Sequence, residues 1–210
     1  MQKNILNRMK NWILIILCLS ISVIYGQNRQ PKELGIGFAI ADNPYSYEDM
    51  SHPKDIYTNK ELTNRIQTDK IFPFFYKPDY GLYHFICLEK NSSYYKILIN
   101  DSEIGFIPNN KNYIFKNWET ILMTASVERI DKENLIRSNP IETDKKSIIN
   151  DCKYETLKVT DVIERKGEFW IEVSFATNCE PYPKENAERK TGWIKWRNMN
   201  KLLVRIQLLC

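Results

Sequence analysis

The chain has 210 residues, of which 43% are hydrophobic, so it can bury the core of one ordinary domain or two small ones and is not disordered throughout. Its 7 glycines and 9 prolines are too few for a collagen-like or low-complexity chain. The 12% aromatic content, with 12 tyrosines and 5 tryptophans, favours an all-β protein.

Residues 1–26 have the pattern of a secretory signal peptide. A basic start precedes an apolar run from Trp12 to Tyr25, which ends at Gly26. The run is about 14 residues long, and a membrane-spanning helix needs about 20, so a cleaved signal is favoured over an anchor. We therefore expect an exported protein, periplasmic or extracellular, whose mature chain has no stable transmembrane anchor.

The positive charge of the full chain comes mostly from this signal. The net charge is +4, and removing the three basic residues of the signal from the 30 in the chain leaves 27 against 26 acidic residues. The mature chain has no concentrated basic run, since Lys145-Lys146 is flanked by Glu142 and Asp144. Nucleic acid is therefore not an expected partner.

Residues 27–54 are predicted as an N-terminal segment with one strand and one loop. The strand covers 34–41 and could pair with the unit that follows, whereas Asn43-Pro44 and His52-Pro53 make 42–54 a loop. The Gly35-x-Gly37 pair is not a dinucleotide-binding fingerprint, because the third glycine and a following helix are missing. We interpret it as flexible backbone within a strand.

A pattern of three strands then occurs twice. The first copy has strands over 83–88 and 94–99 and a third that opens at Gly105-Phe106; the second has 157–163, 169–175 and one that opens at Gly192-Trp193. The step from Tyr94 to Phe169 is 75 residues and that from Gly105 to Gly192 is 87. The second copy thus carries 12 additional residues, within a polar loop over 176–189.

An aromatic pair opening a strand, a turn, and then Gly-aromatic-aliphatic opening the next strand resembles the bacterial SH3-like domain, a small bent barrel. The stretch 134–140 is similar to the Leu-x-Val-Arg-Ser-Gly-Pro motif of that family, with Asn139 in place of its glycine, whereas the matching stretch 56–59 lacks the Arg and the Pro. We predict an all-β fold of two consecutive SH3-like barrels, 55–125 and 126–210. The resemblance implies a binding or spacing module, frequently at cell envelopes.

Large side chains at alternate positions are expected to fill such small barrels, and the glycine before Phe106 or Trp193 is expected to permit the bend that closes the sheet. Trp170 and Trp193 are predicted as core or half-core residues rather than as a platform for a ligand. Trp196 has the opposite phase to Trp193, so at least one of these two rings should lie on an outer face or at a domain junction.

In eukaryotic SH3 domains, aromatic loop residues line a peptide groove. By this resemblance the candidate ligand contacts are Tyr45, Tyr47, Tyr57, Tyr76 and Tyr80, together with Trp196. The alternative, which stays open, is ordinary half-buried packing of the tyrosines in loops.

Four cysteines remain in the mature chain: Cys87, Cys152, Cys179 and Cys210. In an antiparallel hairpin the residue numbers of paired positions add up to a constant. If Cys152 pairs with Cys179, that sum places the centre of the turn between Arg165 and Lys166. This register predicts a disulfide between Cys152 and Cys179 in an oxidising compartment. The alternative is free thiols in a reducing cytosol, and Cys87 and Cys210 are not assigned.

The sequence does not point to catalysis. The only histidines are His52 and His84, and no cluster has zinc-ligand spacing. Cys87 lies three positions after His84 on one predicted strand, so the two side chains should point to opposite faces and cannot form a nucleophile-base pair. We expect no enzyme activity, no metal and no cofactor.

Two functions follow from these patterns. The favoured one is an exported binding module for a cell-envelope peptide, peptidoglycan or an envelope protein. The alternative is a periplasmic inhibitor or immunity-type protein that binds a protein partner through the 176–189 loop.

Overall fold

The computed structural model describes residues 29–41, 55–77, 82–141, 143, 148, 156–178 and 186–208. The predicted signal peptide lies outside these residues. Within them the chain is built of antiparallel strands, with one 3-10 turn (Thr68–Lys70) and one short helix, α2 (Trp118–Leu122), so the all-β prediction is confirmed. None of the helices among these residues is long and apolar enough to span a membrane.

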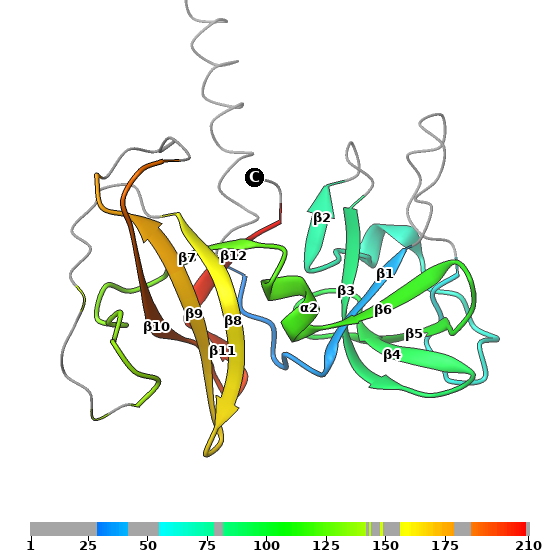
Figure 1. The fold of residues 1–210 in the computed structure, drawn as a ribbon. Helices are drawn as coiled ribbons and strands as arrows, with labels where there is room; N and C mark the ends of the chain where they lie inside the picture. The colour runs from blue at the N-terminus through cyan, green and yellow to red at the C-terminus, as the bar shows by residue number, and fades with distance from the viewer. Residues whose placement is uncertain are drawn as a thin grey trace, which may run out of the picture.

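The first sheet has six strands in the order β5-β4-β3-β1-β6, with β2 paired to β3 (Figure 1). Their bounds are β1 (Gly37–Ala41), β2 (Phe75–Lys77), β3 (Leu82–Lys90), β4 (Tyr94–Leu98), β5 (Ile104–Pro108) and β6 (Tyr113–Asn117). The strand expected within 34–41 is therefore present as β1, and it lies in the middle of this sheet, between β3 and β6.

The second sheet has the order β11-β10-β9-β8-β7-β12. Its strands are β7 (Ser126–Arg129), β8 (Leu157–Arg165), β9 (Glu168–Ala176), β10 (Arg189–Asn198), β11 (Lys201–Leu202) and β12 (Val204–Gln207). Apart from the short strands β2 and β11, the two sheets have the same order, because β6-β1-β3-β4-β5 corresponds to β12-β7-β8-β9-β10. The internal repeat read from the sequence is thus present in the strand order.

In both sheets a segment that is not one of the named strands pairs through an antiparallel bridge with the residue after Gly105 or Gly192. We call it the crossing segment. Tyr57 and Phe106 exchange two backbone hydrogen bonds of 2.8 Å. Arg137 and Trp193 exchange two of 2.8 and 2.7 Å in the second sheet. The stretches 56–59 and 134–140, which the motif comparison aligned, therefore occupy equivalent places.

The two glycines allow this crossing segment to approach closely. A Cβ at Gly105 would lie 3.2 Å from Cγ2 of Ile56 on this segment and 2.5 Å from Cγ2 of Ile99, and one at Gly192 would lie 2.5 Å from Cγ2 of Ile136 on the equivalent segment. Neither glycine has a positive φ. Both glycines leave room for a side chain packed against the strand, and the expected bend stays a prediction.

The two sheets are filled differently. Every second residue of β1 and β3, such as Ala39 and Phe85, belongs to a core made only of residues from the first sheet and from the loop segments beside it. Phe38 and Ile86, on the opposite face of the same strands, belong to a larger core that also contains α2 and the interior of the second sheet. The first unit has its own core, but the expected separate core of the second unit continues into the junction between the sheets.

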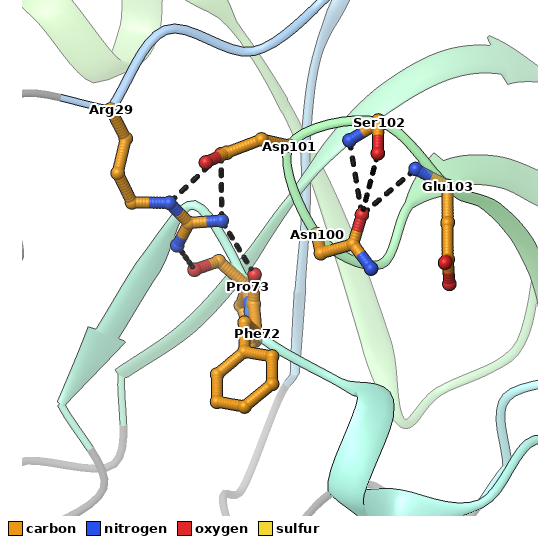
Figure 2. Close-up of polar contacts among 7 residues, drawn as sticks. All are labelled: Arg29, Phe72, Pro73, Asn100, Asp101, Ser102 and Glu103. Atoms are coloured by element: carbon orange, nitrogen blue, oxygen red, sulfur yellow. Dashed lines mark hydrogen bonds and ion pairs between the residues drawn. The ribbon is translucent and has the colours of Figure 1, made fainter.

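The N-terminal segment ties the two sheets together. Arg29 forms an ion pair of 2.8 Å with Asp101 and donates to the backbone carbonyls of Pro73 (2.6 Å) and Phe72 (2.9 Å), as Figure 2 shows. The same figure shows that Asn100 accepts hydrogen bonds from the backbone N–H groups of the two residues that follow Asp101, at 3.0 and 2.8 Å, which shapes this loop.

One residue later the segment reaches the second sheet. The Gln30 side chain donates to the Leu202 carbonyl (3.2 Å) and accepts from the Leu202 N–H (3.0 Å). Gly35 has φ +55°, and a Cβ there would lie 2.2 Å from the Cys87 carbonyl oxygen, while a Cβ at Gly37 would lie 2.3 Å from the Lys116 oxygen. The pair Gly35-x-Gly37 therefore provides close backbone approach rather than flexibility.

The β8–β9 hairpin turns at Lys166 and Gly167, whose φ angles are +54° and +75°. Two positive φ values are typical of a tight two-residue hairpin. This turn lies one residue further along the chain than the disulfide prediction assumed. Cys152 and Cys179 themselves lie outside the described residues, so the disulfide stays a prediction.

Candidate functional site

The structure separates the predicted ligand contacts. Tyr45, Tyr47 and Tyr80 lie outside the described residues. Tyr57 is half-buried on the crossing segment, whereas Tyr76 is 37% exposed on β2, with its ring 5.6 Å from that of the buried Tyr83. Tyr57 and Tyr76 therefore lie on different elements, and no contact joins them among the described residues.

Trp196 lies at the junction between the sheets. It is 2% exposed, and its ring centroid lies 5.0 Å from that of Trp118 and 6.2 Å from that of Phe169. The Arg197 guanidinium covers both the Phe169 ring (3.7 Å) and the Trp196 ring (4.8 Å). A ring buried in this way has no face for a ligand, so we withdraw Trp196 as a contact; its expected place at a domain junction is confirmed.

Tyr57 belongs to a group on the outer face of the first sheet. Phe106 is its hydrogen-bonded neighbour, and the Phe106 ring lies 5.4 Å from that of Tyr94, nearly perpendicular to it. All three are half-buried, and the residues after Tyr94 and Phe106 point into the first core. We call Tyr57, Phe106 and Tyr94 the first aromatic row.

Charged groups flank both ends of the first aromatic row. The Tyr94 hydroxyl donates to the exposed Glu89 carboxylate at 3.1 Å. At the other end the Arg65 guanidinium lies 5.9 Å from the Tyr57 ring centroid and forms an exposed ion pair of 3.2 Å with Asp55. The hydrogen bond with Tyr57, followed by electrostatic interactions with Tyr57 and Asp55, raises the pKa of Arg65.

The second sheet has an equivalent row. Ile97 pairs with Gly105, and Val173 pairs with Gly192, so Tyr94 corresponds to Trp170 rather than to Phe169 as the 75-residue step implied. We call Arg137, Trp193 and Trp170 the second row. Trp193 is half-buried on the outer face of this sheet, which agrees with the prediction of a core or half-core position.

Trp170 is fully buried, as predicted, but it belongs to neither hydrophobic core. The Arg137 guanidinium lies 5.6 Å from its ring centroid, and the Lys195 ammonium lies 5.4 Å from it. Glu168 accepts from Lys195 at 2.8 Å and from the indole N–H at 3.3 Å. This ring is therefore covered by two cations, of which Lys195 is held by the Glu168 carboxylate.

Sequence reasoning missed this arrangement, although its signal was present. Trp170 shares its strand phase with Glu172 and Ser174, while Ile171 and Val173 have the opposite phase and point into the core. Alternation along β9 therefore assigns the indole to the more polar face.

His84 and Cys87 lie on opposite faces of β3, as predicted. His84 packs against the rings of Phe38 (6.3 Å) and Phe75 (5.8 Å), and Cys87 is buried in the first core. Burial, with a smaller effect of the Lys116 charge, lowers the pKa of His84 to about 4, and burial raises the pKa of Cys87 to about 12. These two groups do not form a nucleophile-base pair.

Among the described residues, no group of three or more His, Cys, Asp or Glu side chains could hold a metal ion. The base of the 176–189 loop is closed by a 3.0 Å hydrogen bond from the Thr177 N–H to the Glu188 carbonyl, while 179–185 lie outside the described part of the chain. Comparisons with protein-family models, curated proteins and solved structures found no match to this chain.

Proposed function

We propose that this chain is an exported, non-catalytic binding protein made of two SH3-like barrels, and that it recognises a peptide of the cell envelope, in peptidoglycan or in an envelope protein. The repeated strand order and the equivalent crossing segments support the family resemblance. The basic start and apolar run of residues 1–26 support export.

The observation that carries the proposal is the first aromatic row. The rings of Tyr94 and Phe106 lie 5.4 Å apart, Tyr57 is the backbone-paired neighbour of Phe106, and all three residues are half-buried, with a carboxylate at one end and a guanidinium at the other. Domains that bind extended peptides use aromatic surfaces of this kind, since rings bury area at low entropic cost and charges fix the direction. We propose no metal, no cofactor and no reaction.

Sedimentation with isolated peptidoglycan sacculi tests this function. The chain from residue 27 onward should pellet with sacculi, and Phe106→Ala should lower the bound fraction about tenfold because it removes the central ring of the row. Trp193→Ala is the matched control at the equivalent place in the second sheet, and it should retain binding. Circular dichroism of each variant verifies that it is folded.

Two results would contradict the proposal. One is a wild-type chain that stays in the supernatant, and the other is equal loss of binding in both variants. Recovery of one stoichiometric protein partner that tolerates Phe106→Ala would instead favour the inhibitor alternative.

A further inference from the structure

The two aromatic rows differ in what lies over their rings. In the second row, Arg137 and Lys195 place their cations over Trp170. The duplication places Tyr57 where Arg137 stands and Pro108 where Lys195 stands, since Gly105 corresponds to Gly192. The first row therefore has neither of the two cations that lie over Trp170 in the second row.

The first row keeps the groups that would receive a cation. Tyr94 and Phe106 are half-buried, and among the described residues the cation that lies over a ring of the row is that of Arg65, at its far end over Tyr57. Glu89 accepts a hydrogen bond from the Tyr94 hydroxyl and has no ion-pair partner among the described residues. An exposed carboxylate beside two half-buried rings attracts a positive group through both charge and the ring quadrupole.

One charge of the first unit opposes such a ligand. Lys96 is the cross-strand neighbour of both Glu89 and Phe106, and it forms neither an ion pair with Glu89 nor a contact over the rings. Its ammonium should repel a cation bound at the row. Replacing Lys96 with a neutral residue should therefore strengthen the binding of a cationic ligand.

We propose that the first aromatic row binds the ammonium or guanidinium side chain of an extended peptide, with that cation over Tyr94 and Phe106 and paired to Glu89. In this arrangement the ligand supplies the cation that Arg137 and Lys195 supply within the second unit. This inference rests on the proposed peptide-binding function and specifies the chemistry of its ligand.

The test compares two tetrapeptide probes, acetylated and amidated, of sequence Ala-Ala-Lys-Ala and Ala-Ala-norleucine-Ala. Nuclear magnetic resonance titration of the chain from residue 27 should show the lysine probe shifting the amides of Tyr94 and Phe106, and binding about threefold to fivefold more tightly than the norleucine probe. Glu89→Gln should abolish that preference, and Lys96→Met should increase it.

Glu172→Gln, an outer-face carboxylate of the second sheet, is the control and should change nothing. Equal affinity for the two probes, or an unchanged preference in Glu89→Gln, overturns the inference. Glu89 is exposed, so its loss should leave the fold intact. If sacculi still bind while the two probes bind equally, the proposed function stands and only this inference fails; if sacculi do not bind, the proposed function fails.

Discussion

The indole of Trp118 lies against the indole of Trp196, with ring centroids 5.0 Å apart, and this contact joins the two sheets. Trp118 also packs edge-on against Phe38 of the first sheet at 4.5 Å and donates its N–H to the Leu34 carbonyl at 2.8 Å. The helix that carries it begins at Asn117, whose side chain accepts from the Thr120 N–H. The short helix α2 therefore holds the Trp118 ring in contact with residues of both sheets.

We expect Trp118→Ala to lower the free energy of unfolding by about 3 kcal/mol or more, because it removes a buried ring and leaves a cavity between the sheets. Urea denaturation monitored by circular dichroism measures this change. Met123→Ala, at the exposed end of the same helix, should be nearly neutral. A loss no larger than that of the Met123 variant would show that the sheets do not depend on this contact.

Gly105→Ala should destabilise the protein by roughly 1–3 kcal/mol, because the new methyl group would lie 2.5 Å from Cγ2 of Ile99. The same substitution at Gly192 should have a similar effect, since the new methyl group there would lie 2.5 Å from Cγ2 of Ile136. Gly167→Asn is the control, because Gly167 has open space around it and Asn tolerates its positive φ. Thermal melts that show no difference from the control would refute the role assigned to both glycines.

Stability should fall as the pH drops below the ordinary pKa of histidine. His84 has a pKa of about 4 in the folded protein against 6.5 when unperturbed, so between these values the unfolded chain binds more protons than the folded one. The contribution is fully present above about pH 6.5 and is lost progressively toward pH 4, with a size of at most roughly 3 kcal/mol. His84→Phe keeps a ring against Phe38 and Phe75 and should flatten this part of the profile. Parallel profiles for wild type and variant would disprove the effect.

The Arg29 clamp should stabilise the fold through its pairing with Asp101. Since Arg29 is mostly buried and also donates to two carbonyls, Arg29→Ala should cost about 1–2 kcal/mol, more than an exposed ion pair does. A double-mutant cycle with Asp101→Asn should give a coupling energy of about 1 kcal/mol. Lys32→Ala is the control, because its side chain is exposed. Additive effects of the two substitutions would rule out the pairing as a source of stability.

The repeat could be predicted from the sequence because its signals are local. Alternation over 83–88 and 169–175, and a glycine before Phe106 or Trp193, are visible within a few residues of one another, and the structure shows the corresponding strands. The alignment was wrong by one residue on β9, where Tyr94 matches Trp170. Both copies open this strand with two adjacent aromatic residues, Tyr94-Tyr95 and Phe169-Trp170, so the residue types alone do not fix which positions are equivalent.

The N-terminal clamp and the cations over Trp170 could not be predicted in the same way. Arg29 reaches Asp101 across 72 residues, and Arg137 reaches Trp170 from a crossing segment whose path depends on the close approach at Gly192. These contacts arise from topology, and the periodicity of a single strand does not contain them.

The most direct test of the binding surface is a nuclear magnetic resonance titration of the labelled chain with soluble peptidoglycan fragments. The account predicts that the largest amide shifts fall on Tyr57, Tyr94 and Phe106, that residues around Trp193 stay unchanged, and that Phe106→Ala removes the response. Shifts centred on the 176–189 loop or on the junction at Trp196, or no shift at any fragment concentration, would contradict it.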